Sequence, residues 1–412
     1  MNIATLVTGT AISQSILFVA TPFLTRLYTP EEFGVFALYV SIVMIISTVS
    51  TWKYELAIML PREEEDALAL LFLSSLVCFL TSLLLFLLVL FFRGFIVGHI
   101  TDRVGTFIWL IPLGTLILGH FQILYSFSVR HRNFRNVSAS RITQSTVSVL
   151  TQIGSRTTVF LPLGLILGNL FGSLAGTLAM TVNQLKMGRI HLRNFSRERL
   201  RTNAELYKDF PRYQTFSAFL NVLTQNLPVL LLTFFYNPGI AGFYALTQRI
   251  MAVPTGLIGE STRQVYYQKA SVLHAGGDNI WSLYKKTTLG LFKVGVIPFI
   301  LVGVFAPWLF SILFGSEWRV SGEYVQLIIF WSFLLFINPP TVSNIYILGL
   351  QKFYLKYEVI LTILRFLGIY LPYLFFRNHY LSVLGFGVAG FLMNLILIIL
   401  VANKIRPALS KE

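Results

Sequence analysis

The stretch Tyr28-Thr-Pro-Glu-Glu-Phe-Gly-Val-Phe-Ala-Leu38 recurs in the second half of the chain as Tyr236-Asn-Pro-Gly-Ile-Ala-Gly-Phe-Tyr-Ala-Leu246. Both copies follow the pattern Tyr-x-Pro-x-x-x-Gly-x-aromatic-Ala-Leu. In each copy a proline and a glycine hold the same places in a short turn between two long apolar runs. This repeated corner predicts that the chain consists of two copies of one helical unit.

The composition indicates a membrane protein. Of the 412 residues, 55% are hydrophobic and only 12% are charged, and the mean hydropathy is +0.71, which is too apolar for a soluble globule. The single cysteine, Cys78, excludes an intramolecular disulfide and a cysteine-based metal site. Residues 1–25 lack the basic segment and cleavage signal of a secretory leader, so we expect them to form a retained helix.

Twelve apolar runs are each long enough to cross about 30 Å of hydrocarbon at about 1.5 Å per residue. Six of them fall at 3–25, 34–60, 68–92, 104–128, 137–155 and 158–185. The other six fall at 215–235, 240–261, 288–314, 323–348, 357–376 and 382–403. The predicted fold is all-α and polytopic, with a six-helix lobe at 1–186, a basic linker at 187–213, a second six-helix lobe at 214–404 and a tail at 405–412.

The fifth run is unusually polar for a membrane span. Its side chains include Ser138, Ser140, Thr143, Gln144, Ser145, Thr146, Ser148, Thr151 and Gln152. Such a helix suits a position against other helices or beside a water-filled cavity.

The distribution of lysine and arginine predicts the orientation in the membrane. With the amino terminus in the cytoplasm, most of the basic residues fall in cytoplasmic segments, above all in the linker. The opposite side holds only Arg26, Arg93, Arg103, Arg156, Arg319 and Arg377. We therefore expect both termini to be cytoplasmic. The net charge of +15 is then a topology signal and does not require nucleic acid. Because each lobe has an even number of spans, the repeat is predicted to be parallel.

The sequence lacks the residue patterns that metal binding, ATP binding and catalysis require. The six histidines are scattered over loops on both sides, so no metal site is expected. No glycine-rich loop leads into Lys and Ser/Thr, so the chain has no phosphate cradle for ATP, and energy would come from an ion gradient or from the substrate's own gradient. The outer loops are short and carry few carboxylates, which argues against an enzyme.

The informative residues are the charges inside the spans, because a mid-bilayer Arg or Lys costs about 2.5–3.5 kcal/mol and normally faces a cavity or a partner. Arg249 lies about 16 Å along a helix from the turn at Pro238, and Arg365 lies about 14 Å from Lys356, so both are predicted near the midplane. For each, an arginine satisfied by other helices is the competing interpretation.

The remaining charges lie nearer the surface. Arg141, Lys53 and Lys293 are within reach of cytoplasmic water by snorkelling, so they either line the cavity or extend to that surface. Glu55 follows Lys53 at i+2, a spacing that places them on different helix faces and implies no direct pair.

Glu55, and Glu260 at the end of another span, are candidate ion carriers. Arg26 either caps a helix end or lines the outer mouth of a cavity. Arginines at depth with almost no acid beside them predict an anion site, since a guanidinium binds phosphate oxygens bidentately.

Several motifs resemble those of bacterial polysaccharide transporters, specifically oligosaccharide-lipid flippases of the Wzx type. They are the segments 22–34 (Pro-Phe-Leu-Thr-Arg-Leu-Tyr-Thr-Pro-Glu-Glu-Phe-Gly), 54–61 (Tyr-Glu-Leu-Ala-Ile-Met-Leu-Pro), 164–168 (Gly-Leu-Ile-Leu-Gly), 207–213 (Tyr-Lys-Asp-Phe-Pro-Arg-Tyr) and 242–249 (Gly-Phe-Tyr-Ala-Leu-Thr-Gln-Arg). The resemblance runs from about residue 3 to the last span.

The resemblance implies a transporter of the multidrug, oligosaccharidyl-lipid and polysaccharide exporter (MOP) superfamily, with two lobes forming a V around a central cavity. Such proteins flip an undecaprenyl-pyrophosphate-linked repeat unit across the bacterial inner membrane by alternating access for O-antigen, capsule or exopolysaccharide assembly. The implied energy source is a proton or sodium gradient. The expected state is a monomer among membrane lipids, working with a polysaccharide polymerase and a chain-length regulator. Among the candidates, Arg249 best matches the cationic cavity residues of the family.

Three alternatives stay open at this point. A major-facilitator transporter is disfavoured because its usual loop motif is absent from the segment 60–67, Leu-Pro-Arg-Glu-Glu-Glu-Asp-Ala. An ion-coupled exporter of drugs or other small solutes would be expected to carry deep acidic residues. A membrane-embedded oligosaccharide polymerase or ligase would need a large outer loop with catalytic groups.

Overall fold

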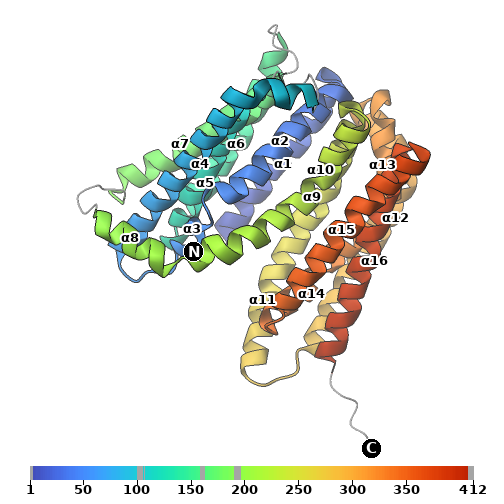
Figure 1. The fold of residues 1–412 in the computed structure, drawn as a ribbon. Helices are drawn as coiled ribbons and strands as arrows, with labels where there is room; N and C mark the ends of the chain where they lie inside the picture. Colours follow the sequence, from blue (N-terminus) through green and yellow to red (C-terminus); the bar gives the residue numbers. More distant parts are fainter. Residues whose placement is uncertain (1–2, 100–104, 106, 158–162, 190–195, 407–412) are drawn as a thin grey trace, which may run out of the picture. The chain divides into compact units, whose positions relative to one another are not determined.

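The computed structural model describes residues 3–99, 105, 107–157, 163–189 and 196–406, and every regular element in these ranges is a helix. Nine of the described helices are long and apolar enough to cross a membrane. The chain is therefore an all-helical, multi-pass membrane protein, as the composition predicts (Figure 1).

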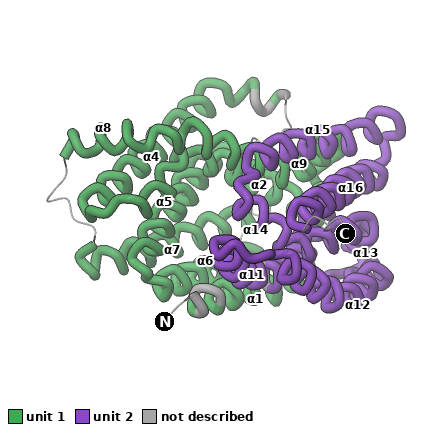
Figure 2. Tube along the Cα trace, turned by 90° about the horizontal axis from the view of Figure 1, so that it is seen from below, with its two compact units in different colours: residues 1–242 green, residues 243–412 purple. Residues whose placement is uncertain are grey.

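Packing divides the chain into two compact units, unit 1 at residues 1–242 and unit 2 at residues 243–412, which Figure 2 colours green and purple. Unit 1 holds α1 (Ile3–Leu27), α2 (Pro30–Ser50), α3 (Tyr54–Ala57), α4 (Glu64–His99), α5 (Leu110–Arg130), α6 (Phe134–Gly154), α7 (Gly164–Lys186), α8 (Arg197–Leu206), the π-helical turn η4 (Phe210–Gln214) and α9 (Thr215–Phe235). Helix α10 (Pro238–Pro254) begins in unit 1 and continues into unit 2.

Unit 2 continues with a π-helical turn, η5 (Thr255–Gly259), and six helices. These are α11 (Glu260–Ala275), α12 (Trp281–Phe314), α13 (Arg319–Ile337), α14 (Pro339–Ile347), α15 (Gln351–Phe376) and α16 (His379–Ile405). The structure groups α9 with the N-terminal unit, whereas the sequence assigned residues 214–404 to the second lobe. The lobe boundaries stay a prediction.

The helices follow the twelve predicted runs closely. Three runs fail the length or hydropathy needed for a candidate span among the described residues: α1, the polar α6, and the run that η5 divides into α10 and α11. Long helices such as α4 and α12 extend beyond their predicted runs because polar residues continue them past the apolar segment.

The repeated corners pack against each other. A Cβ atom at Gly34 would overlap the carbonyl of Pro238, and one at Gly242 would overlap the carbonyl of Pro30. Each glycine therefore leaves the space that the proline carbonyl of the other copy occupies. The first corner is also fixed by a capping box, in which Thr29 and Glu32 hydrogen-bond to each other's backbone N–H. Sequence repetition therefore corresponds to a reciprocal contact between α2 and the start of α10.

A glycine face on α7 brings this helix against α6. Gly168, Gly172 and Gly176 recur every fourth residue, and a Cβ at any of them would lie 3.0 Å or closer to a backbone carbonyl of α6. Small residues at this spacing let membrane helices approach closely and replace packing against lipid. This contact fixes the polar fifth run of the sequence, now α6, inside unit 1.

The end of the second predicted span differs from expectation. Helix α2 stops at Ser50, and Trp52 and Lys53 adopt left-handed conformations with φ of 50° and 59° before the short α3. This reversal brings the Lys53 ammonium within 3.3 Å of the Glu55 carboxylate. The prediction that the two residues lie on different faces of one helix was wrong, because it assumed that the helix continues past Ser50.

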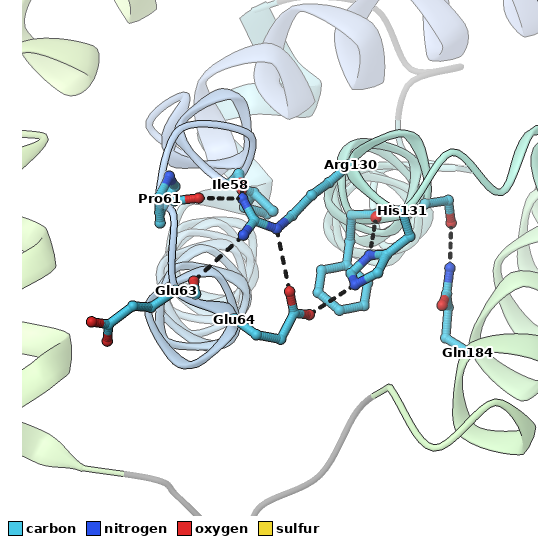
Figure 3. Close-up of polar contacts among 9 residues, drawn as sticks. Ile58, Pro61, Glu63, Glu64, Arg130, His131 and Gln184 are labelled. Atoms are coloured by element: carbon cyan, nitrogen blue, oxygen red, sulfur yellow. Dashed lines mark hydrogen bonds and ion pairs between the residues drawn. The ribbon is translucent and has the colours of Figure 1, made fainter.

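Two arginines hold the segment 58–66, which leads into α4 and includes its acidic first turn. Arg130 at the end of α5 donates to the carbonyls of Ile58 and Pro61 at 3.0 and 2.8 Å, and it approaches Glu64 (Figure 3). Arg199 of α8 lies within 3.3 Å of Glu63, Glu65 and Asp66. The linker helix α8 is thereby attached to unit 1.

Candidate functional site

Unit 1 contains a polar cavity of about 460 Å³. Its lining comes from five helices and comprises Thr10, Ser13, Gln14, Leu17, Met44, Phe121, Arg141, Gln144, Ser145, Ser148 and Asn169. Most of these side chains carry a hydroxyl, an amide or a charge, and none of these described lining residues is acidic. A cavity of this size is within the usual range for small-molecule sites.

Arg141 is the only charged group in that lining. Its Nη1 donates to Thr10 Oγ1 at 2.8 Å, and its Cζ lies 5.2 Å from the centre of the Tyr125 ring. A guanidinium has five N–H donors, and Thr10 is its one protein acceptor among the described residues. The side chain is half-buried, so it can present its other donors to an anion in the cavity.

Close packing of α6 holds Arg141 in this position. Ser13 of α1 donates to the Arg141 carbonyl at 3.1 Å, and Ser138 donates to the Thr5 carbonyl at 2.8 Å. On the other side of α6, Gln144 donates to Ser173 of α7 at 3.2 Å. The polar run at 137–155 thus both packs against neighbouring helices and lines a cavity, which the sequence had left as alternatives.

The predicted ion carrier Glu55 is buried in a satisfied cluster. Its carboxylate accepts a hydrogen bond from Thr51 Oγ1 at 2.6 Å and pairs with Lys53, and the side chain of Glu55 is almost fully enclosed. Because α2 has already ended, this pair lies beyond the second long helix. Lys53 and Glu55 are the two sequence candidates that the structure brings into direct contact.

Arg365 lies in the interior of unit 2. It is 5% exposed, and its Cζ lies 4.8 Å from the Trp331 ring centre and 4.7 Å from that of Phe386. Its Nε has no hydrogen-bond partner among the described residues. The electron-rich faces of the two rings stabilise the guanidinium by cation–π interactions. Arg365 is therefore a buried charge held by its own unit.

Sequence reasoning missed Glu358, which belongs to the same buried face of α15. Its side chain is 8% exposed and lies seven residues, or about 10 Å along the helix, before Arg365. The i, i+7 spacing of an acid and a base was the available signal. The glutamate gives Arg365 a counter-charge inside the same unit.

The other candidates are dispersed. Arg249 is half-buried on α10, whereas Arg26 near the end of α1 and Lys293 on α12 are exposed. Glu260 begins α11, and its side chain lies outside the described part of the structure. No group of three or more His, Cys, Asp or Glu residues that could hold a metal occurs in the described ranges.

The model of a family described as "Polysaccharide biosynthesis protein" matches residues 23–323. The chain belongs to this polysaccharide biosynthesis protein family. The match covers most of the chain, including both repeated corners, Arg249 and the cavity lining from α2, α5, α6 and α7, and it agrees with the resemblance to Wzx-type flippases.

Solved structures show how far this family member shares a known fold. The lipid II flippase MurJ in an inward closed conformation is 13% identical, with a TM-score of 0.75, and the match covers 97% of this chain and 89% of MurJ. An inward-facing multidrug resistance MATE family transporter of the MOP superfamily is 12% identical, with a TM-score of 0.67, over 98% and 95% of the two chains.

A MOP superfamily transporter from Pyrococcus furiosus is 14% identical, with a TM-score of 0.61, over 98% and 95% of the two chains. At these identities the likeness is one of fold. The family member therefore has the two-lobe fold of MOP transporters. No curated protein matches its sequence.

Proposed function

We propose that this protein is a flippase that moves an undecaprenyl-pyrophosphate-linked oligosaccharide repeat unit across the bacterial inner membrane by alternating access. The observation that carries the proposal is the cavity of unit 1, whose hydroxyl and amide side chains suit a sugar and whose Arg141 suits a phosphate oxygen. Membership of the polysaccharide biosynthesis family and the flippase activity named for MurJ support the same function.

The proposal assigns the substrate-binding residues unequal roles. Arg141 would bind the anionic group directly, because its unused donors border the cavity. Arg249, Arg26 and Lys293 are proposed to contact the lipid-linked substrate at other stages of transport. Lys53 and Arg365 have neighbouring carboxylates of their own, which reduces the charge each can offer to a substrate.

The orientation in the membrane is proposed from the positive-inside bias, with both termini in the cytoplasm. The direction of transport, from the cytoplasmic to the periplasmic leaflet, is proposed from the resemblance to Wzx-type flippases. A proton or sodium gradient is the proposed energy source, with Glu55 and Glu260 as candidate carriers. The products would serve O-antigen, capsule or exopolysaccharide assembly, in company with a polymerase and a chain-length regulator.

Replacing Arg141 by alanine tests the assignment. A charge-assisted hydrogen bond contributes about 1.5–3 kcal/mol, so we expect Arg141→Ala to lower surface polysaccharide at least about tenfold in a host that lacks its own flippase and that the wild-type chain complements. Arg141→Lys keeps the charge without the bidentate geometry and should give an intermediate level.

Arg135→Ala is the matched control, since Arg135 is an exposed arginine on the same helix. Equal polymer from Arg141→Ala and wild type, at equal protein level in the membrane, would remove Arg141 from the site. Failure of the wild-type chain to complement flippase-deficient strains, combined with export of a small cation, would favour the small-solute exporter instead.

A further inference from the structure

Unit 2 has a second pocket, of about 350 Å³, between α11 and α12. Hydroxyl side chains of Ser261, Thr262 and Thr287 line it together with the ammonium of Lys269, and Val265 and Leu283 add apolar walls. None of the residues proposed above to bind the substrate is among its lining residues.

The pocket is electrostatically unbalanced. None of its described lining residues is acidic, and Lys269 forms no ion pair within the part of the chain that the structure describes. Lys285 and Lys286, on the exposed surface of α12, are likewise without an ion pair there. Lys285 and Lys286 do not line the pocket, so its positive charge comes from Lys269. An ammonium group without an ion pair beside the Thr262 hydroxyl favours an anion with several oxygen atoms.

The surface beside the pocket is apolar. Val265, Lys269 and Val272 follow i, i+4, i+7 spacing on one face of α11, and the two valines are 54% and 69% exposed. A lysine between exposed valines is the arrangement in which the side-chain stem lies in a hydrocarbon environment while the ammonium reaches a polar layer. The face is therefore suited to a molecule with a charged head and an apolar tail.

The start of α12 is suited to a membrane surface. Trp281 is half-buried at the first position of α12, and tryptophan gathers at the headgroup level. The 34 residues of α12 span about 51 Å, which exceeds the roughly 30 Å hydrocarbon core, so the ends of the helix extend into the headgroup layers. Thr287 lies only about 9 Å along the helix from Trp281.

We propose that this pocket binds the headgroup phosphate of an anionic phospholipid in the cytoplasmic leaflet. Lys269 and the Thr262 hydroxyl would donate to the phosphate, and the acyl chains would lie along Val265 and Leu283. The Thr287 hydroxyl already donates to the Leu283 carbonyl at 2.9 Å. Basic pockets between helices on the cytoplasmic side are suited to anionic headgroups. The proposal rests on the predicted orientation of the chain and is independent of the transported substrate.

Native mass spectrometry of the full chain, purified in detergent and titrated with phosphatidylglycerol or phosphatidylcholine, tests the site. A basic residue near an anionic headgroup contributes about 1 kcal/mol, so Lys269→Gln should weaken phosphatidylglycerol binding about fivefold and leave phosphatidylcholine binding unchanged. Lys269→Arg should retain the affinity, and Thr262→Val should lower it by a smaller factor.

Lys404→Gln is the matched control, since Lys404 is an exposed lysine at the end of α16 and outside the pocket. Equal weakening by Lys404→Gln and Lys269→Gln would mean that general surface charge attracts the lipid, and the proposal would be wrong. Displacement of phosphatidylglycerol by an equimolar short-chain prenyl pyrophosphate would also overturn it, because the pocket would then belong to the transported lipid. The measurement needs no transport, so it stands or fails separately from the flippase proposal.

Discussion

Arg141 in unit 1 and Arg365 in unit 2 are both arginines within membrane helices, but their surroundings are opposite. Arg141 borders a polar cavity of about 460 Å³ and uses one hydroxyl as its partner, whereas Arg365 is 5% exposed and lies between two aromatic rings. Glu358 supplies a buried counter-charge only to the second. The comparison teaches that location within a membrane helix does not by itself describe the surroundings of an arginine, since only Arg141 borders an unfilled polar space.

Removing Arg365 should have the largest effect on stability. Arg365→Ala deletes the contact with Trp331 and Phe386 and removes a positive charge that attracts the buried Glu358 without a direct ion pair, at a cost of about 3 kcal/mol. We expect a clear fall in the thermal unfolding midpoint in detergent. Combining Arg365→Ala with Glu358→Gln should restore part of the loss, because the buried carboxylate is then neutral.

If Arg365→Ala were as stable as the wild type but did not transport, the comparison would be wrong. Arg365 would then bind substrate, as Arg141 is proposed to do. Arg365→Lys serves as the conservative variant. It keeps the charge but loses the planar guanidinium that fits between the rings.

An intermediate loss of stability is expected from disrupting the contact between α6 and α7 that supports the cavity. In Gly172→Ala the new Cβ would lie 2.5 Å from the Gln144 carbonyl oxygen, so α6 and α7 must separate. Overpacking of this kind costs about 1–3 kcal/mol. Both the thermal unfolding midpoint and the level of surface polysaccharide should fall. Gly290→Ala is the control, because a Cβ there has no atom within 4 Å; an equal fall in both variants would show that the α6–α7 contact is not responsible.

The smallest effect is expected for the stability of Arg141→Ala. The change removes one hydrogen bond to Thr10 and a ring contact from a half-buried, water-accessible site, so unfolding free energy should change by less than about 1 kcal/mol. Thermal unfolding beside the transport assay separates the two roles. A loss as large as that of Arg365→Ala would mean that Arg141 is structural and that the difference between the two arginines is not one of function.

Local sequence predicted the helices well because apolar length and turn residues act locally. The seventh run was expected at 215–235, and α9 spans Thr215–Phe235. The polar residues of the fifth run indicated a helix against other helices or beside a cavity, and α6 is both. The break after Ser50 could not be predicted, since no proline or glycine marks it. Neither could the pair of Lys53 and Glu55, which depends on left-handed conformations at Trp52 and Lys53.

The sequence by itself determined that this protein crosses the membrane many times as a duplicated helical chain, because hydropathy and the repeated corner are properties of short segments. Only the tertiary structure decided what each polar residue does. It set Gly34 against Pro238, placed α6 between α1 and α7, and enclosed Arg365 while leaving Arg141 beside open space. The physical reason is that the energy of a charge in a membrane depends on which side chains surround it, and those side chains come from helices distant in sequence.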